Sequence, residues 1–359
     1  MKPNYWSYIR VEELLSLQNG LGDREPEKNE EVMFIVVHQI DELWFKLILR
    51  ELKTVRDLFR QSHVPETALA RAARSLKRVC ILLRLAAEHF ALMETMTPRD
   101  FLDFRDKLVP ASGFQSAQFR EMEILLGLGM ELRVPFGREG SYTSSLRAES
   151  GGSPALERVR RREGDRPYLR EAIEQWLLRT PIEGSQPDET RDREVVDHFL
   201  ERFLERHRAD LTAQMRRIED QTLTHADVDR LKTSYETEMK DAEVFLRAPD
   251  FQRRRIRAAI LFIESYRELP LLSWPREILD LVVEMEQSLL IFRQRHARMV
   301  ERMIGRRVGT GGSSGVDYLD ATAIKYRIFE DVWAVRTLLL REASIPPLAN
   351  ASFYEFRAQ

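Results

Sequence analysis

Residues 31–60, EVMFIVVHQIDELWFKLILRELKTVRDLFR, decide the fold class of this chain. Their apolar residues recur at spacings of three and four, which places them on one face of a helix. They are Met33, Val37, Ile40, Trp44, Ile48, Leu52, Val55 and Leu58. A stripe this long and regular indicates a helix that packs against other helices along its whole length.

The same spacing continues through most of the 359 residues, and no convincing run of alternating apolar and polar residues indicates a strand. The chain therefore predicts an all-α fold, a multi-helix, bundle-like single domain over 1–359. Thr97-Pro98 has the residue types of a helix cap and first turn, and Pro110 and Gly113 end the short helix that follows. Further helical patterns are predicted at 66–96, 114–127, 168–179, 251–268, 276–304 and 320–341.

Two segments differ in character from the rest. Residues 136–166 are rich in Gly, Ser and Arg and lack a sustained apolar period, which predicts a mobile, loop-rich surface insertion. Residues 191–246 are dense in charge and are expected to form a solvated helical pair within the same domain.

Composition excludes several classes of protein. The 56 basic and 58 acidic residues leave a net charge of −2, so neither nucleic acid nor an anionic membrane is an expected partner. Cys80 is the only cysteine, which excludes an internal disulfide and fits a reducing cytoplasm. The chain has no signal-peptide pattern at its start and no apolar run long enough to cross a membrane.

His296 lies in the middle of an apolar helical stripe, where its ring nitrogens need partners. The stripe consists of Met285, Leu289, Phe292, His296, Met299 and Met303. A core histidine bonded to a backbone carbonyl and a single axial ligand to haem iron both fit this position. A zinc or di-iron site is not supported, because the helix carries no second ligand at a suitable spacing. The remaining histidines need no functional explanation: His89 is taken as structural, and His63, His198, His207 and His225 as solvated.

Three further stretches offer side chains for binding a ligand. Phe34 and His38 share one side of the 31–60 helix, one turn apart, and Phe101 and Arg105 have the same spacing on the next short helix. Arg105 lies on an apolar face, where an arginine either pairs with a neighbouring carboxylate or grips the carboxylate of a ligand. The run 309–315, GTGGSSG, has four glycines that let the backbone approach a ligand closely, although a flexible linker has the same composition.

Four stretches in this order resemble the tryptophan 2,3-dioxygenase family of haem enzymes, and the longer, animal-type members most. They are YWSYIRVEELLSLQ at 5–18, FIVVHQIDELWFK at 34–46, FLDFRDKLVPASGFQSAQFR at 101–120 and RHARMVERMIGRRVGTGGSSGVDYL at 295–319. RVPF at 133–136 and LREAIEQWLLRTP at 169–181 extend the likeness over most of the chain.

The resemblance implies a role for each matching residue. His296 matches the axial ligand of haem b iron, with Gly309 and Gly311 on the cofactor side, and His38 matches the histidine near the indole nitrogen of tryptophan. The matching substrate contacts are Phe34, Phe101, Arg105 as the carboxylate clamp, Thr310 in the glycine loop, and Tyr5 and Tyr8, which in this family reach into a neighbouring subunit.

The resemblance also implies the reaction, in which O2 opens the pyrrole ring of L-tryptophan to N-formyl-L-kynurenine in the first step of tryptophan breakdown. His38 and Arg105 are expected to be catalytic, in a cytoplasmic homotetramer. Two other interpretations remain at this point: a superfamily haem enzyme that acts on a modified tryptophan or another aromatic amino acid, and a non-catalytic protein such as a haem sensor or a scaffold. A sensor would need a haem ligand but no carboxylate clamp.

Overall fold

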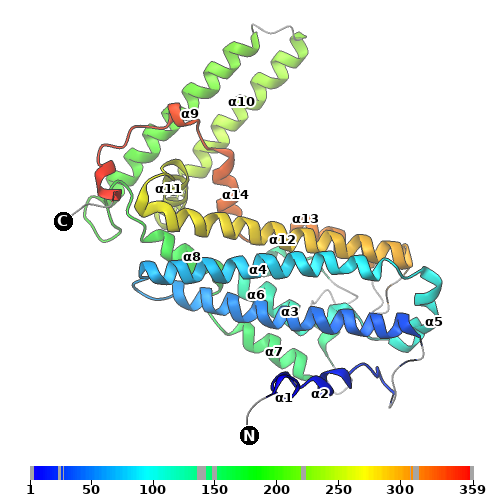
Figure 1. Ribbon diagram of the computed structural model, residues 1–359. Coiled ribbons are helices and arrows are strands. Elements are labelled where there is room, and N and C mark those ends of the chain that lie inside the picture. Colours follow the sequence, from blue (N-terminus) through cyan, green and yellow to red (C-terminus); the bar gives the residue numbers. More distant parts are fainter. Residues whose placement is uncertain are drawn as a thin grey trace. The chain divides into compact units, whose positions relative to one another are not determined.

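The computed structural model describes residues 4–22, 26, 28–135, 143–147, 152–219, 224–307, 309 and 315–355. Over these residues the regular structure is helical, apart from an isolated bridge between Ile182 and Ser185, so the predicted all-α class is confirmed (Figure 1). The longer helices are α3 (Asn29–Phe59), α4 (Glu66–Met93), α5 (Pro98–Leu108), α6 (Ala117–Leu126), α7 (Pro154–Glu163), α8 (Leu169–Leu178), α9 (Asp192–Glu219), α10 (His225–Leu246), α11 (Phe251–Ser265), α12 (Ser273–Ile304), α13 (Gly315–Lys325) and α14 (Glu330–Thr337), and α1 (Tyr5–Ile9) and α2 (Val11–Leu15) are short.

The chain divides into two compact units. Unit 1 contains residues 1–53, 77–168 and 285–328, and unit 2 contains 54–76, 169–284 and 329–359.

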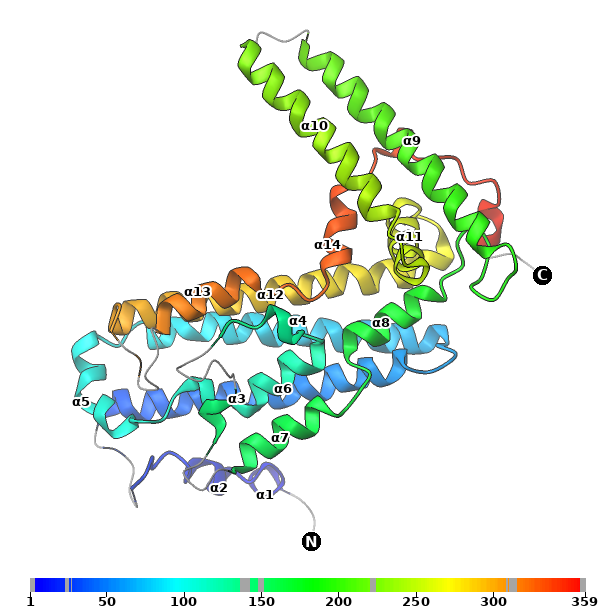
Figure 2. The same ribbon diagram turned by 180° about the vertical axis from the view of Figure 1, so that it is seen from behind.

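Unit 1 is organised around α3 and α4, which run side by side in both ribbon views (Figures 1 and 2). The expected stripe of α3 does face the core, since Val37 and Ile48 are buried. On the outer side an ion pair of 3.0 Å joins Arg78 of α4 to Glu51 of α3. Burial of one helical face and pairing on the other fix these two helices together.

Helix α5 begins where the sequence predicts. The Thr97 hydroxyl accepts from the backbone N–H of Asp100, the Asp100 carboxylate accepts from the N–H of Thr97, and Pro98 occupies the first turn. Two lysines hold the helix to the start of α3: Lys107 donates to Glu31 at 2.7 Å, and Lys28 pairs with Asp103. These contacts give the residues of α5 a defined position in unit 1.

The structure differs from the sequence prediction at 136–166, where a loop-rich insertion was expected. Residues Pro154–Glu163 form α7, because Ser153 caps the helix and Pro154 fits its first turn. Leu156 and Val159, three residues apart, are buried in a cluster with Ala117, Ile124 and Leu146. Two apolar residues one turn apart are enough to pack this short helix on the cluster. The sequence prediction relied on a longer repeat of apolar residues, which α7 lacks.

Two boundaries near the end of the chain also differ. A single helix was expected over 320–341, but α13 ends at Lys325 and α14 begins at Glu330. Between them the backbone N–H of Ile328 donates to the buried carboxylate of Glu286. The chain thus satisfies this donor outside a helix, so the helical pattern is interrupted.

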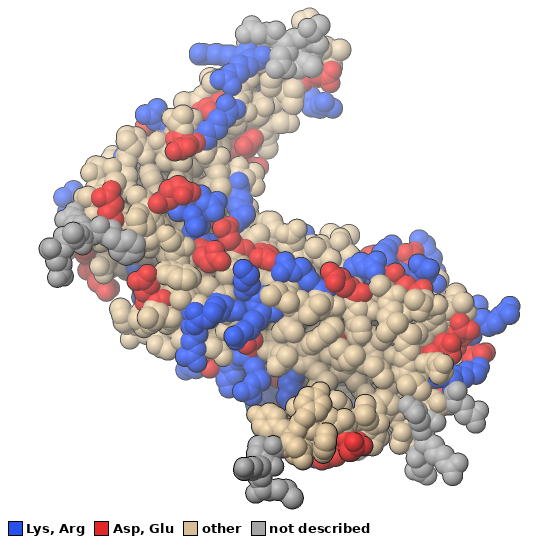
Figure 3. Space-filling model, viewed as in Figure 1, with Lys and Arg blue, Asp and Glu red and all other residues tan. Residues whose placement is uncertain are grey.

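Unit 2 contains the α9–α10 hairpin, in which Lys, Arg, Asp and Glu side chains are interspersed along the surface (Figure 3). His207 of α9 is an exception to the expected solvation, being 4% exposed and 3.9 Å from Glu238 of α10. Near the base of α9, the buried Arg255 donates from Nε and Nη2 to Asp192 at 2.8 and 3.0 Å. Among the described residues no helix has both the length and the apolar character needed to cross a membrane.

Substitution of Leu156 by alanine tests the docking of α7. Because the side chain is buried, Leu156→Ala should lower the free energy of unfolding by about 2–5 kcal/mol, measured by urea denaturation. The exposed Arg160 on the same helix supplies the control, and Arg160→Ala should change stability little. Equally mild effects of the two substitutions would contradict a docked helix.

Candidate functional site

His38 lies on α3 within a group of aromatic rings in unit 1. Its ring centroid is 4.1 Å from that of Phe34, one turn earlier. Phe34 in turn lies 6.0 Å from Phe101 and 5.6 Å from Phe104 of α5. The structure therefore brings together Phe34, His38 and Phe101, which the sequence placed on two separate helices.

The hydrogen bonding of His38 fixes which of its nitrogens is available. Nδ1 is 2.7 Å from the backbone carbonyl oxygen of Phe34. A carbonyl only accepts, so Nδ1 carries the proton and donates. Burial lowers the pKa of His38, which keeps the ring neutral near pH 7. Nε2 is then an unprotonated acceptor.

Arg105 follows Phe101 by one turn of α5 and is half-buried. Phe101 and Phe104, the latter directly before Arg105, both pack on Phe34. Aromatic rings with an arginine on the same helix are suited to a ligand that combines an aromatic ring with a carboxylate.

His296 lies on α12 and stacks on Phe90 of α4, with ring centroids 5.3 Å apart and planes 15° from parallel. Phe292, one turn earlier on α12, packs 6.2 Å away. Burial lowers the pKa of His296 to about 4, and repulsion by His38 and Arg293 adds to the effect. Its imidazole is therefore neutral and has a lone pair to offer.

His38 and His296 together define the centre of the site. Burial lowers the pKa of both imidazoles. A positive charge on His38 also lowers the pKa of His296. Both residues are half-buried.

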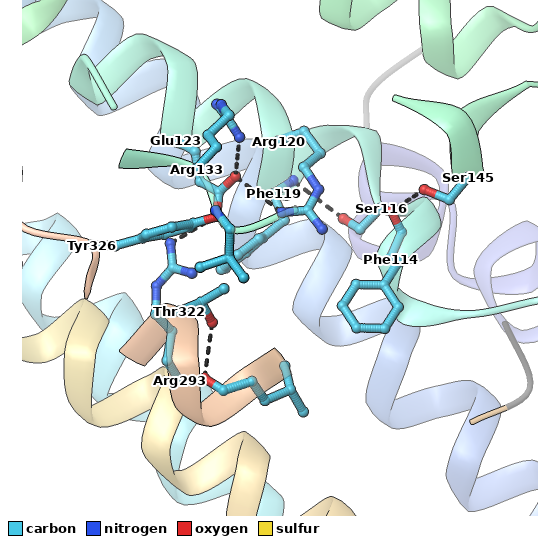
Figure 4. Close-up of polar contacts among 12 residues, drawn as sticks. Phe114, Ser116, Phe119, Arg120, Glu123, Arg133, Ser145, Arg293, Thr322 and Tyr326 are labelled. Carbon is cyan, nitrogen blue, oxygen red and sulfur yellow. Dashed lines mark hydrogen bonds and ion pairs between the residues drawn. The ribbon is translucent and has the colours of Figure 1, made fainter. Parts of the chain in front are cut away.

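A network of buried charges surrounds Glu123 (Figure 4). Glu123 of α6 has no exposed surface and accepts hydrogen bonds from Arg293 at 2.8 Å and from Arg120 and Arg133 at 3.1 Å each. Arg293, one turn before His296 on α12, lies between the rings of Phe119 and Tyr326, at 5.2 and 4.7 Å from their centroids. These four charged residues carry three positive charges and one negative.

Sequence analysis did not single out any residue of this network. A usable signal was present, because Glu123 interrupts the apolar run EMEILLGL at 121–128, and Arg293 precedes His296 by one turn. Charged residues on an apolar helical face need partners. The sequence did not indicate that those partners were each other.

Other expected site residues are not part of this cluster. Tyr5 and Tyr8 on α1 are 73% and 80% exposed, so they point to the surface of the chain. Gly309 is half-buried, whereas Thr310 and Gly311 lie outside the described residues.

These features define a helical protein whose site combines two deep, neutral histidines with an aromatic slot and a nearby arginine. Comparison with known proteins identifies its relatives. A model of the tryptophan 2,3-dioxygenase family matches residues 2–339. A tryptophan 2,3-dioxygenase of Sorangium cellulosum is 55% identical, over 99% of this chain and 88% of that protein.

Tryptophan 2,3-dioxygenase 2 of Ralstonia nicotianae is 51% identical, over 99% of this chain and 98% of that protein. A tryptophan 2,3-dioxygenase-like protein of Xanthomonas campestris is 48% identical, over 73% of this chain and 98% of its own length. The chain belongs to the tryptophan 2,3-dioxygenase family.

Replacement of Glu123 by glutamine tests the charge network. Burial alone would raise the pKa of Glu123, but Arg120, Arg293 and Arg133 outweigh it and lower the pKa from 4.5 to about 2. A lowered pKa means that the carboxylate stabilises the fold fully above pH 4.5 and loses this effect as pH falls toward 2.

Glu123→Gln should therefore cost about 3–5 kcal/mol at neutral pH, since three buried arginines lose their counter-charge. The difference from the unsubstituted protein should shrink as the solution is acidified below pH 4.5. Thermal unfolding across a pH series measures both effects, with the exposed Glu88→Gln as control. A cost that does not vary with pH would contradict the ionic role of Glu123.

Proposed function

We propose that this protein catalyses the O2-dependent opening of the pyrrole ring of L-tryptophan to N-formyl-L-kynurenine, at a haem b whose iron is bound by His296. Membership of the tryptophan 2,3-dioxygenase family supports the activity and the oxidoreductase class. The observation that carries the proposal is the grouping of His38 with Phe34 and Phe101, together with the electrostatic interaction of His38 with the buried, neutral His296.

The residues around His296 fit a haem. The ring is neutral, as an iron ligand must be, and Phe90 stacks on it and fixes its plane. The Glu123 network has two more positive charges than negative ones, and the two propionate carboxylates of a haem would balance them. Haem, when bound, supplies the ability to activate O2.

The protein contributes substrate binding and orientation. We assign Phe34 and Phe101, whose rings pack on each other, to the indole ring, and Arg105 to the carboxylate, which its guanidinium can hold with two parallel hydrogen bonds. We assign Thr310 to the amino acid end of the substrate, and Gly309 and Gly311 to the cofactor side. Fixing both ends of tryptophan orients its reactive C2=C3 bond toward the cofactor.

His38 accepts a hydrogen bond from the indole N–H through Nε2. Nδ1 is occupied by the Phe34 carbonyl, so only Nε2 is available. The pKa of an indole N–H is far above that of an imidazole, so the proton stays on the substrate. His38 thereby positions the indole without removing its proton.

Tyr5 and Tyr8 complete the site from a neighbouring subunit in our proposal. Their exposure in the single chain leaves both rings available for such a contact. α1 also exposes Trp6, at 60%, so the surface that the segment offers is mainly aromatic. A homotetramer would bring this segment to a neighbour's site.

The first test follows product formation by haem-reconstituted, reduced protein with L-tryptophan in air. The near-ultraviolet absorbance of N-formylkynurenine should rise, and His296→Ala should lose both this activity and the Soret band of bound haem. A Soret band without product in the unsubstituted protein would overturn the dioxygenase assignment. Full haem loading of His296→Ala would overturn the ligand assignment.

Arg105→Lys tests the carboxylate clamp. Lysine keeps the charge but cannot form two parallel hydrogen bonds, so KM for L-tryptophan should rise by about tenfold or more, with a smaller change in kcat. Steady-state kinetics measures this, and Arg99→Lys, an exposed position on the same helix, should match the unsubstituted enzyme. An unchanged KM in Arg105→Lys would place the carboxylate elsewhere.

A further inference from the structure

Asp41 and His89 form a buried acid–base pair close to His38. Asp41 follows His38 by three residues on α3, and His89 lies on α4 directly before Phe90, the residue that stacks on His296. Oδ1 of Asp41 and Nδ1 of His89 are 3.5 Å apart. The pair thus connects the helix of one active-site histidine to the helix that packs on the other.

The two facing atoms of the pair lack hydrogen bonds to any residue in the part of the chain that the structure describes. Asp41 Oδ1 and His89 Nδ1 are both buried and form no hydrogen bond, while the side chains are 11% and 14% exposed. Trp44, one turn after Asp41, covers His89 with an edge-on contact of 5.1 Å. A buried carboxyl beside a buried imidazole can exchange a proton only with the other or with occasional water.

The surroundings favour the neutral form of each member. Burial, with a smaller contribution from the neighbouring Glu42, raises the pKa of Asp41 to about 7. Burial also lowers the pKa of His89. Glu42 itself accepts from the side-chain amide of Gln118 at 2.6 Å, and no other charged group is found to act on the pair among the described residues.

The pair can act on His38 electrostatically. His89 is close enough to lower the pKa of His38, and Glu42 raises it. A change of one charge on the pair therefore changes the potential at the His38 ring, in an environment that screens charges poorly.

We propose that Asp41 and His89 share one exchangeable proton and act as positioning residues for His38, strengthening its Nε2 as an acceptor for the indole N–H when that proton is lost. The proton leaves to bulk solvent, and the net charge of the pair becomes more negative by one. The role at the indole rests on the proposed function, whereas the electrical effect on His38 does not.

The direction of the pH effect follows from the charge. As pH rises through about 7, Asp41 loses its proton and negative charge appears beside His38. A more negative potential makes Nε2 a stronger acceptor. Affinity for tryptophan should then increase about threefold between about pH 6 and 8.

The test uses protein labelled with ¹³C at the histidine rings, in the full chain and without tryptophan. Any bound haem is kept diamagnetic by reduction under carbon monoxide. The His38 ring signal should show a step near pH 7, and Asp41→Asn/His89→Gln, which preserves shape, should abolish that step. A step that persists in the double variant, or no step in the unsubstituted protein, overturns the proposal.

A matched control comes from another histidine–carboxylate pair, the buried His207 and the half-buried Glu238. His207→Gln/Glu238→Gln should leave the His38 step in place, and loss of the step there would show a general effect of charge and overturn the assignment to Asp41 and His89. Calorimetric titration with L-tryptophan then measures affinity against pH, which should be flat in the Asp41 and His89 double variant. Absence of tryptophan binding would count against the proposed function, while the His38 signal still decides the present proposal.

Discussion

The burial of Glu123 among three arginines is the interaction on which the rest of unit 1 depends. A carboxylate with no exposed surface is stable as an anion only if positive charges surround it, and Arg120, Arg133 and Arg293 provide them. Because Arg293 belongs to α12 and Glu123 to α6, their hydrogen bond fixes the helix that carries His296.

Helix α3 serves the fold and the site with different faces. One face buries Val37 and Ile48 in the core, and Phe34 and His38 lie one turn apart with their rings in contact. Since a helix is rigid over such distances, packing in the core determines where the imidazole of His38 lies. The same helix adds Asp41 one turn later, so structural and chemical roles lie within eight residues of sequence.

Burial gives the histidines of the site a common property. It lowers the pKa of His38, His89 and His296, so each is a neutral imidazole near pH 7. A neutral imidazole can bind iron or accept a hydrogen bond, which a protonated ring cannot do. The tyrosines of α1 differ from these residues, because they are largely exposed.

The sequence by itself determined the all-α class, most helix positions and the likeness to the family, because helical periodicity and motif spacing are local properties. The cap of α5 at Thr97 and Asp100 and the stripe around His296 were predicted from such local patterns. Only the tertiary structure decided which charges meet: Glu123 and Arg293 are 170 residues apart in the chain. It also showed α7 docked through two apolar residues and Asp41 beside His89. Pairing between distant helices depends on how they pack, and no local pattern in one sequence encodes that arrangement.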